Sequence, residues 1–466
     1  MNNNDKKAIK AGTWYTVGNI ISKGMNFLTV PIFTRFLTQD EFGLYNNFIS
    51  WMTIFAVIAT LNLSATLYSA RYDYEKDYDS YKISIISLSF LTTFISMLVV
   101  LAINHYKGDL FQLNATYIIL MFIGIAFNLV IDVFQIIQRI EYNYNKVLIV
   151  SITLITINII ISILLIRILK NNLFGRILGT QFSVIVVGLI LLIDFLSKNK
   201  RIQWKYWKYS IKICIPFIPH LLSLNLLNSM DRVMITNYCG TSFTALYSVA
   251  YSCGIAIRVF TSAFNGAFDP WMCQNIHNHT YDRVRSASKK FIGIISLIII
   301  GMMLLSPELL LVMGGASYLE AKYVMIPVIL GCFCQFIYTF YVNVEQFMKE
   351  TVLMAVATII AAIFNYGTNW YFIPRYGYIA AAYTTLVSYG LLMVIHYFLI
   401  RKIKLNLLFD NKFILICFLI SVLLGIGISY TYENTPLRLG IVIVYSILII
   451  FVLFRNKNVI INIFNK

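Results

Sequence analysis

Long apolar blocks separated by short polar segments make up most of this chain. Windows of about 20 residues, the length of a helix that crosses the hydrocarbon core of a bilayer, identify fourteen such blocks. The segments between the blocks are too short to form a soluble catalytic domain. The pattern therefore predicts an all-α polytopic membrane protein with about 14 transmembrane helices.

The longest polar interruption divides the chain into two parts that partly repeat each other. Asn26 in the first part corresponds to Asn228 in the second, and Tyr45 corresponds to Tyr247. Repeats in the same orientation are related by an axis along the membrane normal and enclose a cavity. We therefore predict two six-helix bundles around a central cavity, followed by two C-terminal helices. The predicted parts are an N-terminal bundle at residues 1–197, a cytoplasmic interfacial linker at 198–212, a C-terminal bundle at 213–404, and two additional transmembrane helices with a cytoplasmic tail at 405–466.

Composition and charge support the membrane assignment. The chain is 59% hydrophobic and 12% charged, whereas soluble domains carry about 25% charged residues. A net charge of +17 could indicate a nucleic-acid partner, but most Lys and Arg residues lie in segments on the side of the amino terminus. This distribution follows the positive-inside rule and places both termini in the cytoplasm. The main exception is the loop after the fifth predicted helix, which holds Arg167, Lys170 and Arg176.

Polar side chains inside five of the predicted spans fall on one face of each helix. An ionisable group at mid-helix costs about 2.5–3.5 kcal/mol, so each needs water or a partner. One-sided stripes indicate helices that line water, and structural pairing between helices is the alternative for every residue. The stripes are Asn19, Ser22, Lys23 and Asn26; Asn128, Asp132, Gln135 and Arg139; Asn225, Asn228, Ser229 and Arg232; Tyr247, Tyr251, Arg258, Ser262 and Asn265; and Tyr338, Tyr341, Glu345 and Lys349.

The deepest cations are Lys23, Arg232 and Arg258, and all three lie in helices that begin the two halves. Cations that converge on one cavity predict an anionic ligand, in the simplest case phosphate or pyrophosphate. We expect no catalytic residue, no metal site, no cofactor and no nucleic-acid partner. The polar residues predicted to line the cavity beside the cations are Asn19, Asn26, Gln135, Asn228 and Tyr251.

Three segments together resemble a known family. They are residues 34–51 (TRFLTQDEFGLYNNFISW), residues 314–321 (GGASYLEA) and residues 365–389 (NYGTNWYFIPRYGYIAAAYTTLVSY). Their order and spacing resemble the polysaccharide biosynthesis (Wzx-type) flippases of the multidrug/oligosaccharidyl-lipid/polysaccharide exporter superfamily. The resemblance extends from about residue 8 to about residue 454.

The resemblance implies a transporter in the bacterial cytoplasmic membrane rather than an enzyme. Its expected substrate is an undecaprenyl-pyrophosphate-linked oligosaccharide, such as a repeat unit of O-antigen, other lipopolysaccharide or capsule. The substrate would cross the bilayer by alternating access, coupled to an ion. A polysaccharide polymerase and other assembly proteins are the expected partners. The matching residues are Lys23, Arg71, Arg232 and Arg258 for the substrate, and Asp132 and Asp231 for the ion.

The repeat also suggests a gate. Gln138 corresponds to Gln346, and the neighbouring Arg139 and Glu345 carry opposite charges near the cytoplasmic ends of their helices. A salt bridge between them could close the cavity in one state of the cycle. The alternative is that each side chain reaches its own membrane surface.

Two other functions are weighed against the flippase. A drug exporter of the same superfamily would usually bind cations, which favours acidic rather than basic cavity residues. An integral-membrane polysaccharide polymerase or ligase would need a sizeable outward loop, and the predicted outer loops are short.

Overall fold

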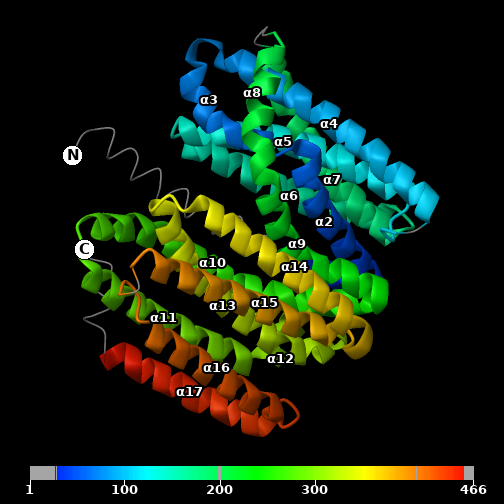
Figure 1. Cartoon of the computed structure of the whole chain (residues 1–466). Coiled ribbons are helices and arrows are strands. Elements are labelled where there is room, and N and C mark those ends of the chain that lie inside the picture. Colours follow the sequence, from blue (N-terminus) through cyan, green and yellow to red (C-terminus); the bar gives the residue numbers. More distant parts are fainter. Residues whose placement is uncertain (1–26, 28, 109, 198–200, 406, 456–466) are drawn as a thin grey trace. The chain divides into compact units, whose positions relative to one another are not determined.

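The computed structural model describes residues 27, 29–108, 110–197, 201–405 and 407–455, and the regular structure within these ranges is helical (Figure 1). Residues 29–36 form the end of a helix that precedes α2. The following elements are α2 (Gln39–Thr60), η1 (Leu63–Thr66), α3 (Leu67–Asp73), η2 (Glu75–Asp77), α4 (Tyr78–Lys107), α5 (Ala115–Ile140), α6 (Tyr144–Ile168), α7 (Asn172–Leu196), α8 (Trp204–Cys214), η3 (Ile215–Phe217), α9 (Ile218–Tyr238), α10 (Thr241–His277), α11 (Tyr281–Leu304), α12 (Ser306–Gly314), η4 (Ala316–Ala321), α13 (Lys322–Phe347), α14 (Thr351–Tyr376), α15 (Tyr378–Lys402), α16 (Asn411–Thr431) and α17 (Thr435–Arg455).

The helices confirm the predicted fold class. Within the described residues, twelve helical segments are long and apolar enough to cross a membrane, and Thr435–Ile450 forms a shorter apolar helix. Most of the first predicted span lies outside the described residues. These spans agree with the expected total of about fourteen.

Contacts between helices divide the chain into two compact units. The first comprises Met1–Ser248 and Val352–Thr384, and the second comprises Val249–Thr351 and Thr385–Lys466. Two helices, α10 and α15, each begin in the first unit and end in the second. The domain boundaries inferred from the sequence remain a prediction.

In the first unit, α7 packs against α5 and α6, and α2 packs against α9. Small residues allow α6 and α7 to approach closely. A Cβ atom added at Gly175 would lie 2.9 Å from the backbone nitrogen of Ile166, and one at Gly179 would lie 2.5 Å from Oγ of Ser162. Such contacts between small residues are how membrane helices gain packing energy without a hydrophobic drive between them.

In the second unit, α11 packs against α13, α16 and α17, and Figure 1 shows α16 and α17 side by side. The buried Arg438 of α17 donates to Glu308 of α12, with 2.6 Å between Nη2 and Oε1. The hydrogen bond from Arg438 holds the pKa of Glu308 below its usual value. A charged contact therefore attaches α17 to α12.

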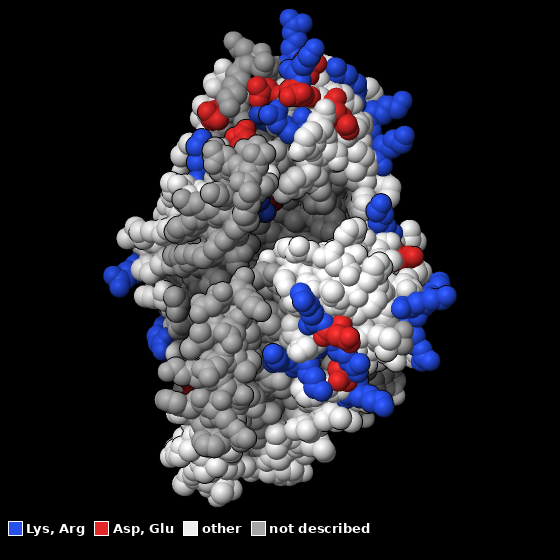
Figure 2. Space-filling model, turned by 90° about the vertical axis from the view of Figure 1, so that its left-hand side faces the viewer, with Lys and Arg blue, Asp and Glu red and all other residues white. Residues whose placement is uncertain are grey.

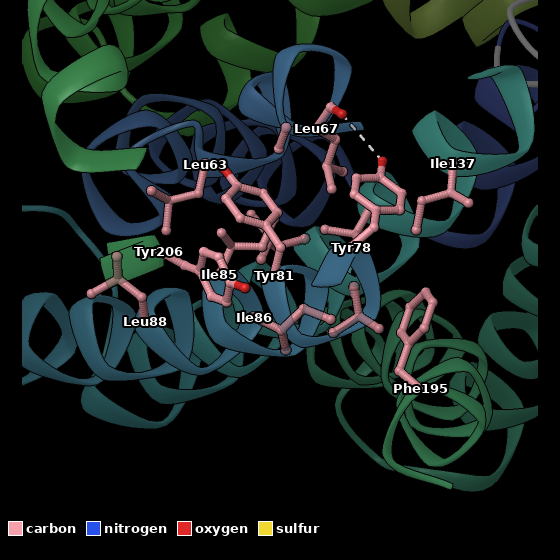
Figure 3. Packing of buried hydrophobic residues seen from close by; sticks show 14 of the residues in the cluster. Leu63, Leu67, Tyr78, Tyr81, Ile85, Ile86, Leu88, Ile137, Phe195 and Tyr206 are labelled. Atoms are coloured by element: carbon pink, nitrogen blue, oxygen red, sulfur yellow. Dashed lines mark hydrogen bonds between the residues drawn. The ribbon is translucent and has the colours of Figure 1, made fainter. Parts of the chain in front are cut away.

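The segment predicted as an interfacial linker contains α8, which packs against α4 and η1. Its Tyr206 is fully buried among tyrosines of the first unit, and Figure 3 shows it beside Tyr81. The hydroxyl groups of Tyr81 and Ser210 lie 2.8 Å apart, and Trp207 donates to the carbonyl oxygen of Ser84. Part of the segment predicted to lie at the membrane interface therefore serves internal packing. We call the set Tyr74, Tyr78, Tyr81, Tyr206 and Tyr209 the tyrosine cluster.

The tyrosine cluster allows a matched test of stability. Replacing Tyr206 by alanine should lower the free energy of unfolding by about 3–5 kcal/mol, because a large buried ring leaves a cavity. Trp204→Ala is the control, since Trp204 is 71% exposed in the same helix and its loss should cost little. Thermal unfolding in detergent measures both. Equal midpoints for the two variants would contradict the packing role of α8.

Charged side chains of the described residues gather in patches on the face shown in Figure 2. One charged contact in the second unit joins Lys289 of α11 to Asp410, with 3.2 Å between Nζ and Oδ2. Asp410 also caps α16 by accepting from the backbone of Phe413, and this bond is the largest cause that lowers the pKa of Asp410. Such contacts lie at helix ends, as expected where spans meet water.

Candidate functional site: polar and charged groups of the membrane helices

The predicted residues of the first span cannot be placed. Asn19, Lys23 and Asn26 lie outside the described residues. Their roles in the cavity remain predictions. The other candidates lie in described helices of one unit or the other.

A buried polar network surrounds Asp231 in the first unit. The two carboxylate oxygens of Asp231 accept from the hydroxyl of Tyr247 at 2.6 Å and from Nδ2 of Asn369 at 2.7 Å. Asn369 also donates to Oδ1 of Asn365 at 3.1 Å and accepts from Thr384. All five side chains are buried. We call this set the Asp231 network.

The Asp231 network joins four helices: the consecutive α9 and α10 on one side, and α14 and α15, more than a hundred residues later, on the other. A buried carboxylate persists in hydrocarbon only where donors replace its hydration. The sequence singled out Asp231 as an ion-coupling candidate, and it singled out Asn365 and Asn369 for the family resemblance. The structure brings these residues together.

Arg232 and Asn228 lie on α9 beside the Asp231 network. Nη1 of Arg232 donates to the carbonyl oxygen of Asn228 at 3.0 Å, and Nδ2 of Asn228 donates to the carbonyl oxygen of Leu224 at 2.7 Å. Both side chains are half-buried. Asn228 and Arg232 therefore lie on one face of α9. Arg232 is a cation within a candidate membrane span.

Arg258 lies in the second unit, on the part of α10 that forms a candidate span. Its guanidinium carbon lies 4.9 Å from the ring centroid of Tyr251, which is buried. Tyr251 was predicted as a polar cavity residue, and its ring faces the cation in an energetically favourable cation–π contact. The two predicted residues therefore act as a pair.

The α5 stripe meets a small cavity in the first unit. Nδ2 of Asn128 donates to Oδ2 of Asp132 at 3.3 Å. Both residues line a cavity of about 130 Å³, together with Asn62 and Ser64 from the segment after α2. With Thr60 at the end of α2, five polar residues line this cavity, and Asp132 borders a space large enough for water or a small ion.

Gln135 and Arg139 continue the same face of α5. Nη2 of Arg139 donates to Oε1 of Gln135 at 3.4 Å, and Nε2 of Gln135 lies 3.4 Å from Oγ of Ser151 on α6. Arg71 lies elsewhere, in the last turn of α3, where its guanidinium carbon is 5.2 Å from the ring centroid of Tyr78. Arg71 therefore lies beside the tyrosine cluster.

Glu345 forms a buried hydrogen-bonded pair with His396 within the second unit. Both of its carboxylate oxygens lie 2.9 Å from Nδ1 of His396 on α15, and the two side chains are at most 1% exposed. The ring of His396 stacks near that of Tyr338 at 5.8 Å, and Nε2 of His396 has no partner within the described residues. Sequence reasoning missed His396, although an ionisable residue inside a predicted span was itself a signal.

A second residue that sequence reasoning missed, the carboxylate Asp269, lies on α10 beyond the candidate span. Burial raises the pKa of Asp269 to about 6, and the side chain of Asn343 opposes this shift. Burial therefore favours the neutral form of this carboxyl group more than water does. Its place next to a long apolar block hid it from the stripe analysis, which followed only positions inside the block.

Comparison with known proteins agrees with this arrangement. The sequence profile of the polysaccharide biosynthesis protein family matches residues 8–276. A protein of the Lsg locus of Haemophilus influenzae is 21% identical over 273 residues, which cover 57% of this chain and 66% of that protein. The chain therefore aligns with less than two thirds of this relative.

Solved structures share the fold. A lipid II flippase, MurJ, in an inward closed conformation matches with a TM-score of 0.73 and 16% identity, over 96% of this chain and 99% of that one. An inward-facing multidrug resistance transporter of the MATE family has a TM-score of 0.62 at 14% identity, over 85% and 95%. An outward-facing multidrug resistance transporter of the MATE family has a TM-score of 0.57 at 15% identity, over 86% of this chain and 96% of that one. With the profile covering more than half of its length, this chain belongs to the polysaccharide biosynthesis protein family and has the fold of these membrane transporters.

Proposed function

We propose that the protein moves an undecaprenyl-pyrophosphate-linked oligosaccharide from the inner to the outer leaflet of a bacterial cytoplasmic membrane. The oligosaccharide would be a repeat unit of O-antigen, capsule or a similar surface polysaccharide. A polysaccharide polymerase and other assembly proteins would then use it. We also place both termini of the protein on the cytoplasmic side of the membrane.

The observation that carries the proposal is the cation Arg258 inside a membrane-spanning part of α10, with its guanidinium against the ring of Tyr251. A cation at this depth is costly unless it serves the function of the helix. An arginine fork matches the oxygens of a phosphate or pyrophosphate. Arg232 on α9 presents the same chemistry in the other unit.

Membership of the family supports a substrate of polysaccharide assembly. The shared fold with a lipid II flippase supports transport of a lipid by this chain, here a lipid-linked glycan. The same fold occurs in inward-facing and outward-facing transporters. Their two states support alternating access, in which one arrangement of the helices opens to each side of the membrane.

Ion coupling would use buried carboxylates. Asp231 and Asp132 are the candidates from the sequence, and the buried carboxylate of Glu345, which is paired with His396, is a further candidate. An Arg139–Glu345 gate also remains a hypothesis. In the structure Glu345 is held by His396 and Arg139 by Gln135. Reversing both charges, Arg139→Glu with Glu345→Arg, tests the gate, because additive losses would exclude it.

Reconstitution tests the proposed function. Vesicles that contain the purified protein and a fluorescent undecaprenyl-pyrophosphate oligosaccharide should show transbilayer movement of the lipid. Protein-free vesicles and the same protein with a cationic drug as the probe are the controls. Movement of the drug alone would favour an exporter of the multidrug type. Lengthening of the oligosaccharide without movement would favour a polymerase or ligase.

The cations give a direct prediction. Arg232→Ala and Arg258→Ala should each lower transport of the pyrophosphate-linked lipid by about tenfold or more, because charge-assisted hydrogen bonds contribute about 1.5–3 kcal/mol. Arg258→Lys should retain more activity than Arg258→Ala, since the positive charge remains. Initial rates in vesicles, normalised to folded protein, measure the effect. Normal transport by the alanine variants would exclude these cations from the substrate site.

A further inference from the structure

Another cation, Arg176, lies inside the first unit, at a place where the sequence predicted a loop. Arg176 is in the second turn of α7, within a candidate span, and is 5% exposed. Its Nη1 donates to Oδ1 of Asn158 at 2.7 Å and to Oγ of Ser162 at 2.8 Å. Both acceptors are neutral groups of α6.

Aromatic rings cover the guanidinium of Arg176. Its central carbon lies 3.5 Å from the ring centroid of Phe33 and 4.6 Å from that of Tyr45. Nε of Arg176 has no hydrogen-bond partner, and no Asp or Glu pairs with Arg176 among the described residues. The cation is therefore buried among neutral groups and still has an unused donor.

The surroundings of Arg176 favour an anion. Its position near the N-terminus of α7 adds the positive end of the helix dipole to its own charge. The close contact of α6 with Gly175 and Gly179 of α7 fixes the backbone on either side of Arg176. A buried charge in hydrocarbon without a charged partner is retained where it serves a ligand or ion path.

Arg176 lines a cavity of about 380 Å³ in the first unit. This volume lies within the range of small-molecule sites, about 300–1,000 Å³. The wall carries aromatic residues, including Phe33 and Tyr45, and polar ones, including Asn46, Asn158 and Thr180. Tyr45 and Thr180 have their hydroxyl groups 3.2 Å apart at this wall.

We propose that this cavity binds an acidic sugar residue, with the sugar carboxylate paired with the guanidinium of Arg176, which lines the cavity. The aromatic rings would cover the apolar face of the sugar, and the amides and hydroxyls would bond its hydroxyl groups. The site is distinct from Arg232 and Arg258, which are assigned to the pyrophosphate. The inference rests on the proposed function, because it names the class of glycan that the flippase carries.

Binding of a soluble probe tests the site without transport. The full-length protein in phosphatidylcholine nanodiscs is titrated with methyl glucuronide, with methyl glucoside as the neutral match and with inorganic pyrophosphate. Methyl glucuronide should bind about tenfold more tightly than methyl glucoside, because a charged hydrogen-bonding partner is lost with the carboxylate. Equal binding of the two sugars, or no binding of either, would overturn the proposal.

Two variants locate the probe. Arg176→Gln should reduce the affinity for methyl glucuronide to that for methyl glucoside. Ile155→Phe adds bulk to the cavity wall and keeps the arginine, so it should weaken the binding of both sugars. This variant keeps the proposal testable if Arg176→Gln does not fold. Unchanged binding in Ile155→Phe, or pyrophosphate that competes fully with methyl glucuronide, would place the anion elsewhere and contradict the acidic-sugar site.

Transport separates this inference from the proposed function. Wild-type protein that binds methyl glucuronide in the cavity but moves no lipid-linked oligosaccharide would refute the flippase and leave the site standing. Wild-type protein that moves neutral and acidic lipid-linked oligosaccharides equally, with the same rates in Arg176→Gln, would refute the site and leave the flippase standing. If Arg176→Gln loses transport of acidic lipid-linked oligosaccharides and keeps transport of neutral ones, the result supports both the acidic-sugar site and the flippase.

Discussion

Transport by an Asp231→Ala variant is expected to fall by about tenfold or more. The carboxylate satisfies the hydroxyl of Tyr247 and the amide of Asn369, all inside the buried Asp231 network. Removal of the carboxylate leaves these two donors unpaired, at about 1–3 kcal/mol each. The variant therefore loses packing around α9 and α14 together with any ion held by the carboxylate. Initial rates in vesicles, with unfolding in detergent, measure the two losses.

Asp231→Asn separates ion binding from structure. Asparagine keeps the size of the side chain and one acceptor oxygen but carries no charge. If Asp231 binds the coupling ion, this variant should exchange substrate between the two sides yet no longer accumulate it when an ion gradient is applied. Tyr247→Phe is the matched control, because it removes one hydrogen bond and keeps the carboxylate. An ion dependence in Asp231→Asn equal to that of the wild type would exclude Asp231 from coupling.

Gly43→Val is expected to disturb a close contact between the start of α2 and the start of α10. A Cβ atom at Gly43 would lie 1.8 Å from the carbonyl oxygen of Thr241, so any side chain forces the two segments apart. Beside it, Asp40 accepts from the hydroxyls of Thr241 and Ser242, the latter at 2.7 Å. Overpacking of this kind costs about 1–3 kcal/mol. If the contact opens during transport, the variant should favour the open state.

Accessibility of position 242 measures this opening. In a chain whose own cysteines are replaced by serine, Ser242→Cys should react about fivefold or more faster with a membrane-impermeant maleimide when Gly43→Val is also present, since 1–3 kcal/mol shifts an equilibrium by about 5–150-fold. Gly367→Val is the control, because Gly367 of α14 has open space around its Cα. Equal labelling rates in both backgrounds would show that the contact does not move.

Local sequence patterns were sufficient for the class of fold. Hydropathy over a window depends only on neighbours in the chain, and the bilayer requires each span to satisfy its own backbone. The spans and the polar face of α9, with Asn228 and Arg232, could therefore be predicted. The Gly-x-x-x-Gly spacing of Gly175 and Gly179 is also present in the sequence, but the sequence does not say which helix packs against these two glycines.

The same windows failed at the ends of helices. Arg176 was assigned to an outer loop because charges cluster around residue 170, whereas the structure begins α7 at Asn172 and buries Arg176 against α6. Residues 198–212 were predicted to form an interfacial linker, but Tyr206 lies inside the tyrosine cluster. In both cases a neighbouring helix supplied the environment, and no local pattern contains that neighbour.

What the sequence determined by itself is the list of spans, the stripes along them and the family. The tertiary structure decided which charges have partners. Asp231 meets Asn369 from more than a hundred positions away, Glu345 meets His396, and Arg176 meets neutral groups and aromatic rings. The physical reason is that an ionisable group in hydrocarbon has its energy set by the few atoms within hydrogen-bonding distance, and for these residues those atoms belong to other helices.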